Sequence, residues 1–164
     1  MTDTSSILVL TEVALSDEDA VRLTSVHAGD PDDRPGYHLM VPADVERNLL
    51  ADVLDHLSLF QLREALEAVR GDDEPSRTEA ADDLALSLAA FTRAGFTATG
   101  EVVEGDPVDV LQKKVGSDAS TREVIVVTRP HAVEDTFHTD WASRAREALG
   151  VPVLHVYAGS SFLG

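Results

Sequence analysis

The sequence contains no cysteine, so neither a disulfide framework nor a zinc site with thiolate ligands is available to it. No apolar run approaches the roughly 18–20 residues that a membrane-spanning helix needs, and the polar start MTDTSS lacks the basic segment of a secretory signal. Positive charge is scarce, because 13 Lys and Arg residues stand against 30 Asp and Glu residues, for a formal net charge of -17. Phosphate backbones and anionic lipids are bound through clustered basic side chains. We therefore expect a cytoplasmic protein that binds neither nucleic acid nor membrane.

Length and composition favour a single domain. The chain has 164 residues, of which 43% are hydrophobic, which is enough for one core and too short for two ordinary domains. Asp44–Arg70 has the spacing of a long amphipathic helix or helix pair, followed by the polar break Gly71–Pro75. We predict one domain over residues 1–164 with a helical insertion over about residues 44–74.

The clearest local pattern lies near the end of the chain. Val124–Thr128 and Pro152–Tyr157 are short β-branched apolar runs, and Trp141–Leu149 between them has helical spacing. Two parallel strands joined through a helix need a right-handed crossover and a sheet covered on both faces. This βαβ unit predicts a doubly wound α/β domain.

Three further strands and three further helices precede this unit. The strands are predicted at Ile7–Val13, Tyr37–Val41 and Phe96–Val103, the last weakened by Gly100. Ser16 is the expected N-cap of a helix that runs to His27, and Ser76, with Glu79 three residues later, predicts a capping box for a helix that ends at Arg93 before Gly95. Pro107 precedes a helix over Val108–Val115.

The order and content of these segments resemble the universal stress protein superfamily. The resemblance rests on five pieces: Ile7-Leu8-Val9-Leu10, Leu39-Met40-Val41, the turn Gly105-Asp106-Pro107, Ile125-Val126-Val127 and Val151-Pro152-Val153-Leu154-His155-Val156. It implies a three-layer fold like that of the adenine nucleotide alpha hydrolases, with a five-stranded parallel sheet of strand order 3-2-1-4-5. It also implies a homodimer that pairs through the last strand.

The resemblance also implies a nucleotide site. In members that bind ATP, an acidic residue after the first strand contacts the nucleotide, and the backbone at the end of the second strand reads adenine. Glu12 and Val41 stand at those positions. Gly105, Arg129 and Thr139 complete the candidate set around the point where strand order reverses, where ligands of such sheets bind. The alternative for Arg129 is an ion pair with a neighbouring acid.

The loop after the fourth strand departs from the binding pattern. ATP-binding members carry a loop of the form G-x2-G-x9-G-[S/T] there, whereas Thr128–Asp140 contains no glycine. Glycines let backbone N–H groups approach phosphates, and Pro130 has no N–H to offer. We therefore expect no conventional binding of ATP or AMP and no cofactor.

No catalytic or metal site is predicted. The serines lack the G-x-S-x-G pattern of a nucleophile elbow. His131, Asp135, His138 and Asp140 share one loop, but their spacing matches no known ligand pattern, and a solvated loop explains the same residues. His155 alternates within the last strand and is expected at an interface or on the surface.

Two hypotheses for function lead from these observations. The first is a dimeric stress-response or regulatory interaction module that does not bind ATP conventionally. The second is a divergent binder of a nucleotide or small anion at the carboxyl ends of the first and fourth strands. An enzyme of unrelated chemistry ranks last. For the dimer, Val151–Tyr157 is predicted to be an apolar edge strand without lysine, which a second copy would cover.

Overall fold

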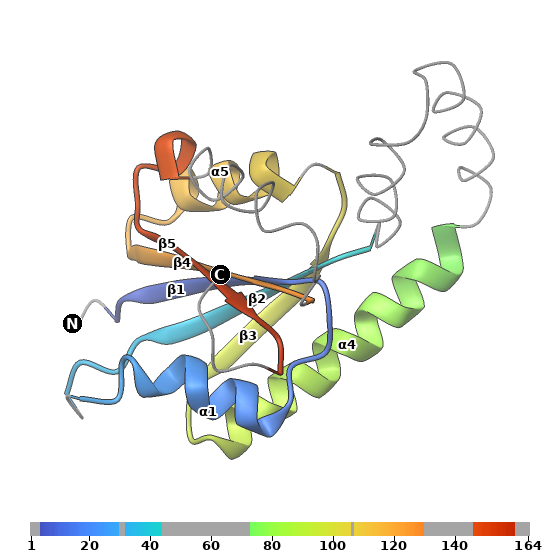
Figure 1. Ribbon diagram of the computed structural model, residues 1–164. Helices are drawn as coiled ribbons and strands as arrows, with labels where there is room; N and C mark the ends of the chain where they lie inside the picture. The colour runs from blue at the N-terminus through green and yellow to red at the C-terminus, as the bar shows by residue number, and fades with distance from the viewer. Residues whose placement is uncertain (1–3, 30–31, 44–72, 106, 130–145, 160–164) are drawn as a thin grey trace.

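A five-stranded parallel sheet forms the centre of the fold. The computed structural model describes residues 4–29, 32–43, 73–105, 107–129 and 146–159 (Figure 1). Within them the strands are arranged in the order β3-β2-β1-β4-β5, and each neighbouring pair is parallel. The strands are β1 (Ser6–Thr11), β2 (Gly36–Pro42), β3 (Ala98–Val103), β4 (Thr121–Thr128) and β5 (Val153–Tyr157). The predicted α/β class and strand order are confirmed.

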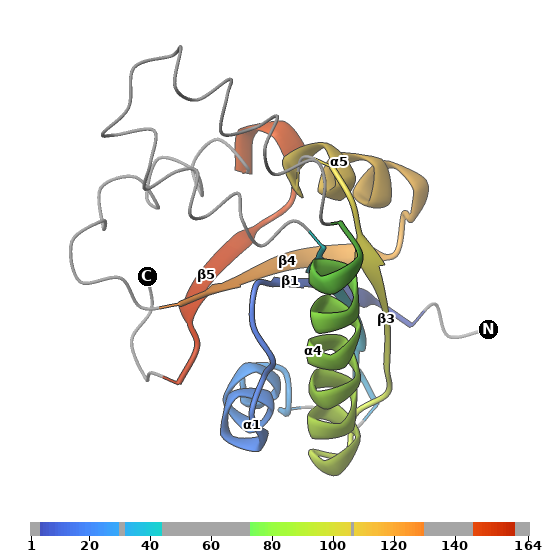
Figure 2. The same ribbon diagram turned by 90° about the vertical axis from the view of Figure 1, so that its right-hand side faces the viewer.

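Helices cover both faces of the sheet. α1 (Asp17–Ser25) and α4 (Asp73–Arg93) lie side by side on one face, and α5 (Pro107–Ser117) and the helical residues 146–149 lie on the other (Figure 1; Figure 2). These three layers are the predicted doubly wound arrangement. In the part of the chain that the structure describes, no helix is both long enough and apolar enough to cross a membrane. The predicted helical insertion covers about residues 44–74, of which residues 44–72 lie outside the described residues and Asp73 and Glu74 belong to α4.

Both faces of the central strands are buried. Successive strand residues point to opposite faces of a sheet, so a strand covered on both sides needs a continuous apolar run. In β1, Ile7 and Val9 point into the core beneath α1 and α4, while Leu8 and Leu10 point into the core beneath α5. All four are at most 5% exposed, which explains why this strand has no polar alternation.

α1 begins with a capping box. Ser16 is the N-cap, as predicted, and its Oγ accepts a hydrogen bond from Asp19 N at 3.1 Å. In return Asp19 Oδ2 accepts from Ser16 N at 3.1 Å, so two N–H groups at the helix start are satisfied. The helix ends at Ser25, two residues before the predicted end, and the chain continues in a turn.

The predicted start of α4 is wrong. The helix begins at Asp73 rather than Ser76, so Ser76 lies inside it and is no N-cap. Proline is compatible with the first turn of a helix, because N–H groups there have no intrahelical partner, and Pro75 therefore does not mark a break. The end is as predicted. Gly95 has φ of +85°, and Phe96 N donates to Phe91 O at 3.1 Å, which is the pattern of a glycine-terminated helix.

Gly100 lets α4 approach the sheet closely. A Cβ at this position would lie 2.5 Å from Leu84 Cδ1 of the helix and 2.8 Å from the backbone oxygen of Leu39 on the neighbouring strand. The glycine that weakens β3 as an isolated strand is thus required where α4 crosses it.

Candidate functional site

The predicted site is at the carboxyl edge of the sheet, where β1 and β4 are neighbours. The chain leaves β1 toward α1 and β2, whereas β4 leads toward β5 on the other side, so the direction of strand order reverses between them. This is the position at which doubly wound sheets bind ligands.

Two predicted site residues come together at this edge. Glu12 N donates to Val127 O at 3.3 Å, which extends the pairing of β1 with β4 by one residue. The Glu12 side chain reaches the chain that follows β4, where its Oε1 accepts a hydrogen bond from Arg129 N at 2.6 Å. A carboxylate of the chain therefore binds the first backbone N–H beyond β4.

Acidic groups of α4 lie next to the same edge. Burial raises the pKa of the Asp83 carboxyl, the charge of Glu79 raises it further, and the positive charge of Arg129 acts in the opposite direction. The Arg129 side chain is exposed and within electrostatic reach of this helix. Its positive charge thus acts on at least one acid of the same chain, Asp83.

Ser87 fixes α4 to the loop that follows β1, and the sequence analysis did not identify it. Its Oγ donates to Asp83 O at 2.7 Å and accepts from Leu15 N at 2.9 Å, and the residue is 0% exposed. The signal in the sequence was a serine on the apolar side of a helix, which indicates a buried hydroxyl with a hydrogen-bond partner. The sequence could not identify that partner, because Leu15 is 72 residues away.

The other predicted residues are less informative. Val41 is 0% exposed and pairs with Val102 of β3, so its side chain is part of the core and only its backbone is available to a ligand. Gly105 is exposed, has φ of +93° and follows β3, two strands from Glu12. Thr139 lies outside the described residues, as do the four candidate metal ligands at positions 131, 135, 138 and 140. Among the residues that are described, no group of three or more His, Asp or Glu side chains is placed to hold a metal ion.

Of the two positions expected for His155, an interface or the surface, the structure excludes the surface. The residue is 5% exposed, its Nε2 lies 2.8 Å from Thr128 Oγ1, and its ring packs against Tyr157 with centroids 5.0 Å apart. Its side chain points to the same face as Val153, which belongs to the core beneath α5. Cover from that face explains why a histidine on an edge strand is buried.

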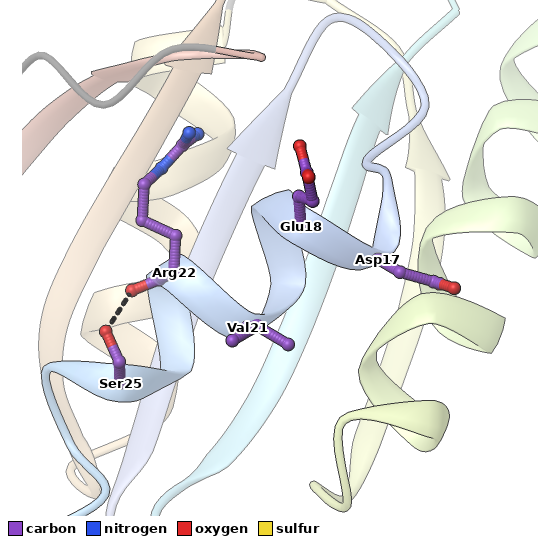
Figure 3. A pocket seen from close by; sticks show the side chains of 5 residues that line it. All are labelled: Asp17, Glu18, Val21, Arg22 and Ser25. Atoms are coloured by element: carbon purple, nitrogen blue, oxygen red, sulfur yellow. Dashed lines mark hydrogen bonds between the residues drawn. The ribbon is translucent and has the colours of Figure 1, made fainter.

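A hollow of about 350 Å³ lies along the outer surface of α1. It is lined by Asp17, Glu18, Val21, Arg22 and Ser25. Figure 3 shows that these side chains diverge, Asp17 toward α4 and Arg22 toward the end of β5. None of the four predicted site residues that the structure describes lines it, and its side chains do not converge on one point.

A partly buried polar cluster at the amino edge joins the turn after α1 to the sheet. His27 Nδ1 lies 3.1 Å from the Tyr37 hydroxyl, and His27 Nε2 lies 2.9 Å from Glu123 Oε2. Burial, together with the negative charge of Glu123, raises the pKa of Tyr37 to about 12. The phenol is therefore held in its neutral form.

No family model matches the chain, and no curated protein is significantly similar to it.

Proposed function

We propose that the protein is a universal stress protein-like domain that acts as a dimeric regulatory interaction module and does not bind ATP in the usual way. The observation that carries the proposal is the hydrogen bond from Arg129 N to Glu12 Oε1. A phosphate held after the fourth strand needs backbone N–H groups as donors. Here the first of them is already bound to a carboxylate.

The electrostatics of the edge support the same proposal. A triphosphate at this place would lie near Glu12 and the acids of α4, and like charges at close range repel strongly where water is partly excluded. Arg129 is a cation at this edge, and its charge already acts on Asp83. The net charge of -17 adds a long-range field that disfavours anionic ligands. We place this function in the cytoplasm, with a protein as the partner.

The alternative is a divergent site for a nucleotide or small anion formed by Glu12, Val41, Gly105, Arg129 and Thr139. It is favoured by one observation, the exposed Arg129 guanidinium at the reversal point. In that case Glu12 would release Arg129 N and contact the ligand instead.

Thermal unfolding with ATP, AMP and Mg²⁺ separates the two functions. A ligand at about 100 times its Kd stabilises the folded state by about 2.7 kcal/mol, which is a shift of roughly 5–10 °C for a domain of this size. The proposed function predicts no shift at millimolar ligand. The alternative predicts a shift that is lost in Glu12→Gln and Arg129→Gln but retained in Glu18→Gln, a control that removes an exposed acid of α1.

We further propose that the homodimer forms through the last strand, Val151–Tyr157. What supports it is the position of β5 at the sheet edge, where β4 pairs with one side of the strand. An apolar edge without lysine lacks the usual protection against pairing with another chain. Light scattering at tens of micromolar should give the mass of two chains, and the mass of one chain would refute the dimer.

A further inference from the structure

A hydroxyl, an imidazole and a carboxylate are aligned on the face of the sheet that α5 covers. His38 of β2 and Thr99 of β3 are register partners on adjacent parallel strands, and Glu101 follows two residues after Thr99. His38 Nδ1 lies 2.8 Å from Thr99 Oγ1, and His38 Nε2 lies 2.9 Å from Glu101 Oε1. Lys114 of α5 donates a further hydrogen bond to Glu101 Oε1.

The protonation of the carboxylate orients the imidazole. The hydrogen bonds from Lys114 and His38 lower the pKa of Glu101, so the group is a carboxylate near neutral pH and can only accept hydrogen bonds. His38 Nε2 must therefore be the donor in that contact. In the neutral imidazole the other nitrogen, Nδ1, is then an acceptor, and the Thr99 hydroxyl directs its proton to it.

The Thr99 hydroxyl is accessible to solvent, and the imidazole of His38 beside it is held in a fixed position. Thr99 is exposed on the edge strand β3, whereas the His38 side chain is 20% exposed and bonded at both nitrogens. Because the two strands are locked in register, the distance between hydroxyl and imidazole does not depend on a mobile loop. A nucleophile next to a base that a third group orients is the arrangement from which hydroxyl nucleophiles derive their reactivity.

We propose that Thr99, His38 and Glu101 form a relay that makes the Thr99 hydroxyl a nucleophile toward activated acyl esters. Thr99 Oγ forms a bond to the carbonyl carbon of the ester while its proton passes to His38 Nδ1. The bond from that carbon to the leaving oxygen then breaks, and the imidazolium returns the proton to the departing alcohol. Thr99 is left as an ester. Glu101 is a positioning residue, and Lys114 holds Glu101. This reactivity is independent of the proposed ligand-free site at Glu12.

The test is acetylation of the full chain by p-nitrophenyl acetate, with the modified residues located by mass spectrometry. General-base catalysis by a positioned side chain contributes about 10²–10⁴-fold to a rate, so Thr99 should be acetylated at least about 100-fold faster than Thr97, an exposed threonine two residues earlier. Thr99→Val should abolish this product, whereas Thr97→Val should not change it.

Two further variants test the role of the imidazole. His38→Gln should slow acetylation of Thr99 to the rate of Thr97, and imidazole added to His38→Ala should restore part of the rate. A merely structural histidine would not respond to added imidazole. Acetylation of lysines is distinguished by its position and does not count. Equal rates at Thr99 and Thr97 in the wild type, or an undiminished rate in a folded His38→Gln, would overturn the proposal.

Discussion

Replacing Asp19 with asparagine should destabilise the protein far more than the same replacement of Asp17, which also lies in the first turn of α1. Asp19 is 3% exposed and joins three parts of the chain. Its Oδ2 accepts from Ser16 N, while its Oδ1 accepts from the Arg22 guanidinium at 2.7 Å and from Gly159 N at 2.9 Å. One carboxylate therefore caps α1, pairs with a cation of that helix and fixes the chain that follows β5.

The magnitude follows from the number of donors that converge on the group. Hydrogen bonds to a charged group contribute about 1.5–3 kcal/mol each, and an amide can replace only one of the two oxygens. In either orientation, the amide N–H groups of asparagine at position 19 would face a hydrogen-bond donor, either Ser16 N or the pair formed by Arg22 and Gly159 N. The positive charge of Arg22 would also lose its negative partner. We expect Asp19→Asn to cost about 3 kcal/mol of unfolding free energy, or roughly 6–12 °C in Tm.

Asp17→Asn is the matched control. Asp17 is also in the first turn, so both variants lose the same interaction with the helix dipole. Its ion pair with Arg93 is exposed, with the two side chains 61% and 59% accessible, and such pairs contribute about 0–1 kcal/mol. Urea unfolding of the two variants at pH 7 therefore isolates the buried network.

The pH dependence gives a second readout. Burial raises the pKa of Asp19, but the hydrogen bonds from Gly159 and Ser16 and the charge of Arg22 outweigh it, so the pKa is lowered overall. A lowered pKa in the folded state means that the stabilisation is complete above about pH 4 and is lost as the pH falls through the folded-state value. The stabilities of wild type and Asp19→Asn should converge in acid. A cost no greater than that of Asp17→Asn, or a difference that persists unchanged in acid, would refute the reasoning.

Two further substitutions test the packing and the polar cluster at the amino edge. Gly100→Ala should cost about 1–3 kcal/mol in urea unfolding, because the added methyl collides with Leu84, whereas Gly36→Ala, with nothing within 4 Å of the new Cβ, should be neutral or slightly stabilising. Tyr37→Phe should lose about 1 kcal/mol at pH 7 with the hydrogen bond to His27. Because burial raises the pKa of Tyr37 from 10.0 to about 12, wild-type stability should fall by about 3 kcal/mol between these pH values, and a stability curve of Tyr37→Phe that falls equally would contradict this assignment.

The sheet could be predicted because its strands carry their own signal. A strand buried on both faces needs an uninterrupted apolar run, and the residues around Leu8, Met40 and Val126 provide one each. The strand order came from the resemblance to a family rather than from the pattern. The start of α4 could not be read correctly, since a proline is equally compatible with a break and with a first turn.

The polar contacts could not be predicted, because they depend on register and packing between distant segments. Glu12 and Arg129 were each placed at the correct edge, but the hydrogen bond between them joins residues 117 positions apart. Likewise, alternation along β2 and β3 does not reveal that His38 faces Thr99, which only the register of two parallel strands decides. The burial of His155 could not be predicted either, because the pattern of apolar residues along one strand does not show which segments pack over it.

The acidity of the chain affects the two proposed sites differently. At the edge of β1 and β4, Glu12 binds a backbone donor that an anionic ligand would need, and we expect the net negative charge of the chain to repel such a ligand. At the β2–β3 pair, the Glu101 carboxylate only orients an imidazole, and a neutral ester experiences no long-range repulsion. At 0.1 M salt, interactions between exposed charges more than about 10 Å apart are largely screened. Added salt should therefore weaken the repulsion of anionic ligands and leave the rate of acyl transfer to Thr99 unchanged. If both proposals hold, the same negative charges disfavour phosphates and leave the approach of uncharged acyl donors unaffected.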